Sequence, residues 1–180
     1  MGPRPPTTGL PWSLGGMRHE ALLGRRWPGP HWLGEGLVTP TAVVLGSLTV
    51  PGRPEQVGRA RSFVAGLAGP SACGPDAADT AALLTSELVT NAMLHTNSGT
   101  ADGTVTIVVV DVADGLMVEV IDDGAPDHGP EVQGDRYASH GHGLFLVEQL
   151  AARWGYLRDG AGTTVWFQLD RGDPGDGLGR

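Results

Sequence analysis

The residues best suited to chemistry are Glu87 and Asn91, a carboxylate and a carboxamide that lie four positions apart in an otherwise apolar stretch. Residues at that spacing share one face of an α-helix. Apolar residues at helical spacing lie on a neighbouring face, so the helix can bury them while the two polar side chains point into a cleft. A solvent-exposed helix edge would have the same composition, so the pair by itself leaves both interpretations open.

A second group, Asp122-Asp123-Gly124, follows an expected strand. A fixed carboxylate at a strand end can accept a hydrogen bond from a ligand that presents a donor. A strand-end Asp that merely forms a turn is the alternative interpretation.

The third group is Gly141-His142-Gly143, which precedes an expected helix beginning at Leu144. Glycines at this place let backbone amides approach phosphate oxygens, and the helix dipole favours the negative charge. All twelve basic residues of the chain are Arg. The P-loop and the eukaryotic-type protein kinase, which both need a lysine on the phosphates, are therefore excluded.

Four motifs, in order along the chain, are similar to the boxes of the GHKL ATP-binding superfamily. Glu87-Leu88-Val89-Thr90-Asn91 resembles the N-box, and Asp122-Asp123-Gly124 resembles the first glycine box. Gly141-His142-Gly143-Leu144 resembles the second glycine box, and Gly162-Thr163-Thr164 resembles the last one. The resemblance covers residues 42–169 and is closest to the anti-sigma-factor serine kinases of actinobacterial type.

The resemblance implies that the protein binds ATP and Mg²⁺ and that Glu87 is the general base. It also implies a set of nucleotide-binding residues, which are Asn91, Asp122, Gly124, Gly141, His142, Gly143, Leu144 and Thr164. Asn91 would be the metal ligand, and Thr164 would support the adenine-binding Asp122. Two positions depart from the family pattern, because His142 replaces a larger basic residue and Thr163 replaces a frequent Lys.

The function implied by the resemblance is that of an ATP-binding regulator of transcription. As a protein serine/threonine kinase it would phosphorylate a protein antagonist and switch partners. The partner would be a sigma factor, an anti-sigma antagonist protein, or both. A homodimer is compatible with this interpretation. Two alternatives stay open: a non-catalytic protein-binding module that uses ATP, and the catalytic half of a split sensor kinase.

Composition limits the other classes of function. The formal net charge of −8 and the isoelectric point near 5.0 argue against direct nucleic-acid binding. A single cysteine, Cys73, cannot form an intrachain disulfide, which favours the cytoplasm. No stretch approaches the roughly 18 apolar residues of a membrane span. A zinc site at His128, His140 and His142 is disfavoured because no further ligand follows at a regular spacing.

The elements that must position these motifs follow from hydrophobic periodicity and turn signals. Strands are predicted over 42–50, 104–112, 116–122, 154–158 and 163–169, and helices over 54–69, 76–96 and 144–153. Asp114-Gly115 predicts a tight hairpin turn, and Asp76 is the expected helix cap. Residues 123–140 are a long Gly/Pro-rich loop that we interpret as a lid, with Arg136 available to the phosphates.

This order of elements predicts an α+β fold, a two-layer α/β sandwich of the Bergerat type. Helices would lie on one face of a mixed, mostly antiparallel sheet. Residues 41–170 would form the ATP-binding domain, and residues 171–180 a disordered tail. The first 40 residues contain eight Gly and seven Pro, which predicts a flexible extension. That extension also carries Trp12, Trp27 and Trp32, so docking on the domain or on a partner is the alternative.

Overall fold

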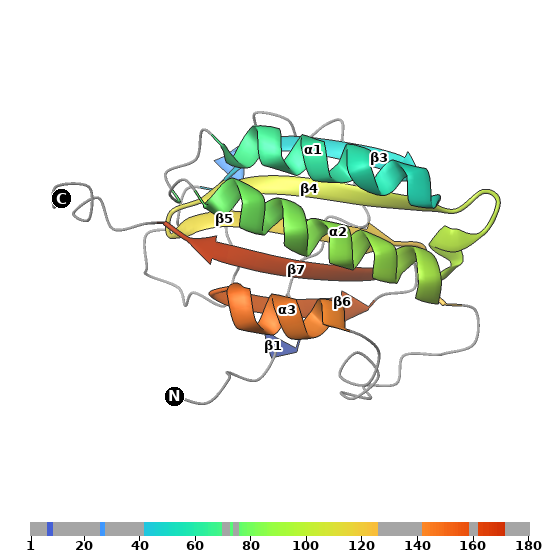
Figure 1. Ribbon diagram of the computed structural model, residues 1–180. Coiled ribbons are helices and arrows are strands. Elements are labelled where there is room, and N and C mark those ends of the chain that lie inside the picture. The colour runs from blue at the N-terminus through green and yellow to red at the C-terminus, as the bar shows by residue number, and fades with distance from the viewer. Residues whose placement is uncertain are drawn as a thin grey trace, which may run out of the picture.

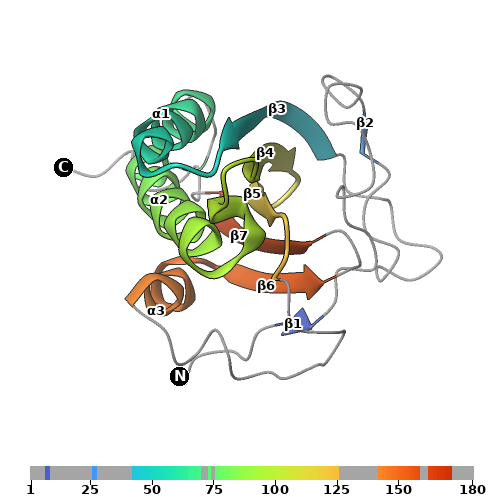
Figure 2. The same cartoon turned by 90° about the vertical axis from the view of Figure 1, so that its right-hand side faces the viewer.

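A computed structural model describes residues 7–8, 26–27, 42–69, 73, 76–125, 142–158 and 162–171. These residues form a seven-stranded sheet in the order β1-β6-β7-β5-β4-β3-β2. The helices α1, α2 and α3 lie together on one face of the sheet (Figures 1 and 2). The predicted two-layer α+β sandwich is confirmed.

The strands follow the runs of β-branched and aromatic residues in the sequence. Their bounds are β1 Thr7–Thr8, β2 Arg26–Trp27, β3 Ala42–Pro51, β4 Thr104–Val112, β5 Gly115–Asp122, β6 Arg153–Arg158 and β7 Thr163–Asp170. Among them, β1 and β6 pair in parallel, and the other neighbours are antiparallel. The predicted hairpin at Asp114-Gly115 is confirmed, since Val112 of β4 pairs with Gly115 of β5.

Two helices, the first two along the chain, pack their apolar faces on the sheet. Helix α1 spans Val57–Ala68 and continues a short 3₁₀ turn, Pro54–Gln56, so the expected start at Pro54 is confirmed. Helix α2 spans Ala77–His95 and is followed by a second 3₁₀ turn, Asn97–Gly99. The apolar stripe predicted on α2 is buried against the sheet, and its members are Ala81, Leu84, Leu88 and Ala92.

The prediction that the Asp76 side chain caps α2 is wrong. Asp76 occupies the N-cap position, but its side chain makes no capping hydrogen bond. Its φ of −83° and ψ of −10° are helical, whereas a capping side chain needs an extended backbone to reach the free amides. Asp76 contributes instead through its carbonyl oxygen, which accepts a hydrogen bond from Thr80 N at 3.0 Å.

Helix α3, His142–Leu150, is shorter than predicted at its C-terminal end. Ala151 N closes its last turn by donating to Val147 O at 2.9 Å. The next amide, Ala152 N, already donates to Gln168 O of β7 at 2.9 Å. The chain has therefore joined the sheet before Arg153, where β6 begins.

Both faces of the central strands are buried. The face under the helices carries the main core, which includes Leu84, Ile107 and Phe167. A second cluster lies on the opposite face of the sheet and consists of Ala42, Val44, Val108, Val110, Met117 and Trp166. We call this opposite side the second face; Glu119 lies on it as well, with no exposed surface.

The sheet edges are paired with residues from the first 40 positions. Thr7 and Thr8 pair with Gly155 and Tyr156 of β6, and Trp27 pairs with Ala42 of β3. The division of the chain near residues 40 and 170 stays a prediction. Among the described helices, none combines the length and the apolar character that a membrane span requires.

Candidate functional site

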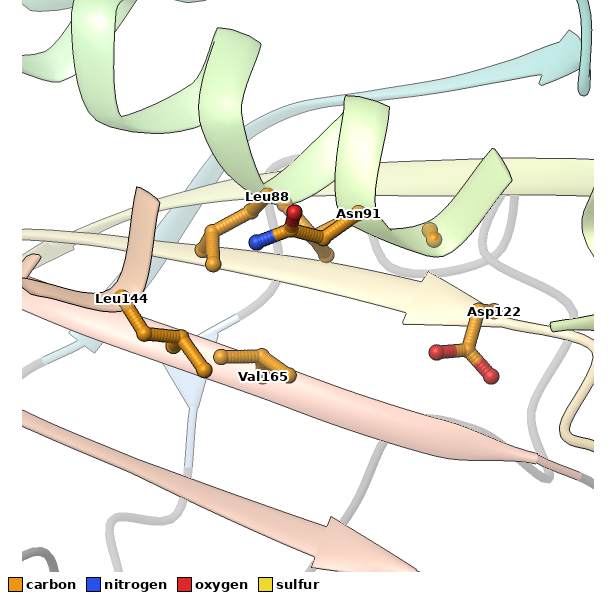
Figure 3. Close-up of a pocket in the computed structure, with 7 residues that line it drawn as sticks. Leu88, Asn91, Asp122, Leu144 and Val165 are labelled. Atoms are coloured by element: carbon orange, nitrogen blue, oxygen red, sulfur yellow. The ribbon is translucent and has the colours of Figure 1, made fainter. Parts of the chain in front are cut away.

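A pocket opens between the C-terminal half of α2, the strands β5 and β7, and helix α3 (Figure 3). Its lining residues are Leu88, Asn91, Ala92, Val120, Asp122, Leu144 and Val165. Apolar side chains dominate this lining, and two polar groups project into it. This composition is typical of a site for a flat apolar ligand that carries a few hydrogen-bonding groups.

Asp122 provides the pocket's carboxylate at the last position of β5. The residue is 5% exposed, and its Oδ1 accepts hydrogen bonds from Gly124 N at 2.7 Å and Thr163 N at 3.1 Å. Burial raises the pKa of Asp122 to about 6, although the two amides and the charge of Arg158 act in the opposite direction. The carboxylate is therefore fixed by the backbone through one oxygen.

Two glycines allow the chain to approach this carboxylate so closely. Gly124 has a φ of +71°, a left-handed conformation that suits glycine and returns its amide to Asp122. Gly162 lies against Asp122, where a Cβ would overlap with the carbonyl oxygen of Asp122. The glycines at these positions are therefore steric requirements of the site.

The turn after α2 holds the same strand end from the other side. The buried Ser98 accepts a hydrogen bond from Asp123 N at 2.9 Å and donates to Thr104 O at 2.5 Å. Asn97 N donates to Gly124 O at 2.6 Å. Sequence reasoning missed both residues, since Asn97-Ser98-Gly99 reads as an ordinary polar turn.

The second polar group of the pocket is the carboxamide of Asn91. Figure 3 shows this side chain projecting from α2 toward the pocket, with Leu144 and Val165 on the opposite side. Glu87 lies one turn earlier on the same helix and is half-buried, but it does not line the pocket. The structure thus brings together Asn91, Asp122 and Leu144, with Glu87 at a distance of one helical turn.

The register of β5 and β7 separates two neighbouring threonines. Thr163 pairs with Asp122, so these residues share the face under the helices. Thr164 pairs with Ile121 and belongs to the second face. The predicted nucleotide-binding residue Thr164 therefore does not lie on the pocket side, whereas Thr163, which was not selected, binds Asp122 through its amide. A count of alternation back from the strand end could have identified Thr163.

Several predicted site residues lie outside the described part of the chain. These are Gly141, most of the expected lid with Arg136, and the histidines His128 and His140. His142 and Gly143 form the start of α3, but their side chains are not described. Within the described ranges, no group of three or more His, Cys, Asp and Glu residues could hold a metal ion.

Comparison with known proteins agrees with the geometry of the pocket. The profile of the histidine kinase-like ATPase domain matches residues 50–169. A serine-protein kinase RsbW of Listeria monocytogenes serotype 4a (strain HCC23) is 31% identical over 115 residues, covering 58% of this chain and 73% of the relative. The serine-protein kinase RsbW of Listeria monocytogenes serovar 1/2a (strain ATCC BAA-679 / EGD-e) is 29% identical over 117 residues, with the same coverage.

The matched region runs from the end of β3 to the end of β7 and includes every described element of the pocket. The order of the four motifs, the fold and the profile all point to one assignment. The chain belongs to the histidine kinase-like ATPase domain family.

Proposed function

We propose that the protein is an ATP-binding regulator that transfers the γ-phosphoryl group of ATP to a serine or threonine of a partner protein. The family assignment supports ATP binding. The relatives named serine-protein kinase favour protein phosphorylation over hydrolysis of ATP alone. A sigma factor or an antagonist of an anti-sigma factor is the class of partner that the motif pattern favours, and the setting would be cytoplasmic regulation of transcription.

The observation that carries this proposal is the buried carboxylate of Asp122. Its Oδ1 is engaged by two backbone amides, which leaves Oδ2 to accept the exocyclic amine of adenine. Guanine presents a carbonyl oxygen at the corresponding place, so a fixed acceptor would reject it. Val120, Val165 and Leu88 supply apolar surface for the base. The residues present therefore fit an adenine nucleotide.

Asn91 would hold Mg²⁺ through its carboxamide oxygen, together with phosphate oxygens and water. A hard cation with one protein ligand and several waters is a common arrangement where Mg²⁺ binds with a nucleotide. The start of α3 at His142 would present backbone amides to the phosphates. ATP would supply the phosphoryl group, and the metal would neutralise charge on it.

Glu87 would accept the proton of the attacking hydroxyl. It lies one turn before Asn91 on α2, and it is half-buried, so a partner side chain can reach it from solvent. General-base assistance of this type contributes roughly 10²- to 10⁴-fold to a rate. Loss of the carboxylate should therefore abolish most of the transfer while nucleotide binding persists.

The test is transfer of radiolabel from γ-labelled ATP to partner proteins captured from the native cell. Label should appear on a partner serine or threonine with the natural chain and fall at least about 100-fold with Glu87→Gln, since the isosteric amide cannot take the proton. Calorimetry should show that Glu87→Gln still binds ATP. Asn91→Ala should instead lose the Mg²⁺-dependent part of ATP binding.

A binding module that uses ATP without transferring phosphate is the second candidate. It is favoured by one observation, namely that Glu87 does not line the pocket. In that case ATP would bind tightly, no partner would become labelled, and Glu87→Gln would leave partner capture unchanged. Those three results together would overturn the kinase proposal and leave ATP binding in place.

A further inference from the structure

Four large apolar side chains are exposed among the residues whose burial the structure describes, and all four lie on the two helices that border the pocket. Leu83 and Leu94 of α2 are 42% and 69% exposed, and Phe145 and Leu150 of α3 are 58% and 45% exposed. These two helices pack against each other on the sheet (Figure 1). Single exposed apolar residues are common, so their placement beside Glu87 is the informative feature.

Two of the four belong to one row along the outer side of α2. Leu83, Glu87 and Leu94 lie at positions i, i+4 and i+11, which return to the same side of a helix after about one and about three turns. The buried Ala81 and Ala92 lie on the opposite side, against the sheet. The proposed general base therefore lies between two exposed leucines.

The charges of α2 and α3 have one sign apart from histidine. The chain has no Lys, and none of its twelve Arg residues lies in either helix, whereas Asp79, Glu87 and Glu148 do. Asp79 is exposed and lies one turn before Leu83 on the same side of α2. We call this set of four residues the outer row: Asp79, Leu83, Glu87 and Leu94. It is apolar and negatively charged, so its electrostatic complement is a basic segment with apolar side chains.

We propose that the outer row is the docking surface for the segment of the partner protein that carries the acceptor hydroxyl. This segment has apolar side chains on both sides of its serine or threonine, and a basic residue beyond one of them. Glu87 marks the place of the hydroxyl, so the docking surface rests on the proposed function.

Helical geometry sets the spacing that the partner segment must have. Along the axis of α2, Leu83 lies about 6 Å from Glu87 on one side, and Leu94 lies about 10.5 Å from it on the other. An extended segment advances about 3.3 Å per residue, so it meets Leu83 about two residues from the hydroxyl and Leu94 about three residues from it. Asp79 lies about 6 Å beyond Leu83 and meets a residue about two positions farther out.

The outer row and the pocket use different sides of the same helix. None of the four outer-row residues lines the pocket, whereas Asn91, one turn after Glu87, does. A segment docked on the outer row therefore keeps its hydroxyl beside the proposed phosphate end of the site without entering the pocket. The hydroxyl oxygen would bond to the γ-phosphorus as the bond to ADP breaks, and its proton would pass to Glu87.

The test measures phosphorylation as a function of the concentration of acceptor protein. An extract of the native cell supplies the acceptors, γ-labelled ATP is saturating, and only label that depends on the added full-length chain is counted. The variants are Leu83→Gln, Leu94→Gln and the two combined, since Gln favours a helix and both positions are exposed. Leu150→Gln is the matched control, because Leu150 is exposed to nearly the same degree as Leu83 but lies on α3.

We expect the combined variant to raise the extract concentration for half-maximal labelling at least about tenfold, because both side chains become buried in the complex. The maximal rate should stay within about twofold of that of the natural chain, since the leucines contribute to binding and not to the chemical step. Calorimetry should show unchanged ATP affinity, because neither leucine lines the pocket. Leu150→Gln should behave as the natural chain does.

The charge of the outer row is tested separately. Asp79→Asn should raise the half-saturating concentration about threefold at low salt, and the difference should disappear at roughly 0.5 M NaCl. Mass spectrometry should locate the label on a serine or threonine with apolar residues on both sides and Lys or Arg farther out. A labelled site among acidic residues would overturn the docking surface.

The outcomes separate this docking surface from the kinase activity itself. Labelling by the natural chain that is insensitive to Leu83 and Leu94, or equally sensitive to Leu150, would overturn the docking surface and leave the kinase in place. No chain-dependent label at any extract concentration would overturn the kinase, and the docking surface with it.

Discussion

Strand β5 carries two buried carboxyl groups, Glu119 and Asp122, that lie three positions apart and therefore on opposite faces of the sheet. Asp122 faces the pocket and accepts hydrogen bonds from two backbone amides, whereas neither carboxylate oxygen of Glu119 has a hydrogen-bond partner in the described part of the chain. Burial raises the pKa of both groups, to about 6 for Asp122 and to about 8 for Glu119. The two amides and the charge of Arg158 lower the pKa of Asp122, so its carboxyl is ionised at neutral pH.

The comparison shows that burial alone does not make a carboxyl group a hydrogen-bond acceptor. A carboxyl that is neutral near pH 7 can donate a proton, but it is a weak acceptor for an amine. Asp122 is preorganised as an acceptor because two backbone hydrogen bonds offset the cost of desolvating its carboxylate. Glu119 is a neutral member of the second face, and we expect it to affect stability without affecting nucleotide binding.

Replacement of Asp122 should give the largest effect on binding. In Asp122→Asn an amide donor would face the amine donor of adenine, so ATP affinity should fall about 100-fold or more and the preference over GTP should disappear. Asp123→Asn, at the exposed neighbouring position, is the matched control and should change affinity little. Calorimetric titration with ATP and GTP measures both affinities. If Asp122→Asn keeps the preference for ATP, Asp122 only forms a turn and does not contact the base.

Glu119 should produce a large effect on stability and none on affinity. Its pKa is raised on folding, so the folded state retains a proton that the unfolded state loses above about pH 4.5. The free energy of unfolding should therefore fall as pH rises from about 4.5 to about 8, by at most about 1.4 kcal/mol for each pH unit. The raised pKa of Asp122 contributes a fall in the same direction, but only up to about pH 6.

The window between pH 6 and 8 therefore isolates Glu119. Urea unfolding of the natural chain should show a decline in stability there, and Glu119→Gln should remove it. The comparison is between slopes, because the absolute stability of the variant also includes the cost of a buried amide. Parallel pH profiles for the two proteins would contradict the assignment.

A smaller effect is expected from protonation of Asp122 in the binding reaction. Below pH 6 the carboxyl takes up a proton and ceases to accept the adenine amine. Adenosine affinity should therefore fall as the pH is lowered, by at most about tenfold for each pH unit. Adenosine avoids the titration of the phosphates. Purine riboside, which lacks the amine, is the control ligand, and an equal pH dependence for both would exclude Asp122 as the titrating group.

Ser98 should give the smallest effect. Ser98→Ala leaves Asp123 N and Thr104 O without their hydrogen-bond partner, which should cost about 1–3 kcal/mol of stability. ATP affinity should fall only a few-fold, because Asp122 retains both of its amides. Ser98→Thr keeps the hydroxyl and should recover part of the loss, and an affinity as low as that of Asp122→Asn would show that the turn itself contacts the nucleotide.

Local patterns predicted the elements that position the pocket. The α2 stripe, the Asp114-Gly115 hairpin and the strand that ends at Asp122 each depend on residues close together in sequence, so periodicity and turn chemistry were sufficient. Asp122 and Asn91 were placed at the strand end and on the helix for the same reason, and their roles in binding stay predictions. The division of the chain into domains and the role of Glu87 stay predictions.

Features that depend on distant pairing were not predictable in the same way. The hydrogen bond from Thr163 N to Asp122 depends on the register of β7 on β5, which the sequence of β7 does not specify. The burial of Glu119 and the hydrogen bond from Asp123 N to Ser98 also depend on chain segments far away in sequence. Asp76 failed as a side-chain cap because its backbone conformation, and not its residue type, controls the reach of its side chain.

The pairing of β1 with β6 has a consequence for the order of folding. Thr7 and Thr8 are synthesised about 150 residues before Gly155 and Tyr156, and parallel pairs at such separation carry a high loop-closure entropy. By contrast, β2 and β3 are separated by 14 residues and can associate early during translation. Of the described strands, β1 leaves the ribosome first and is therefore expected to join the sheet last.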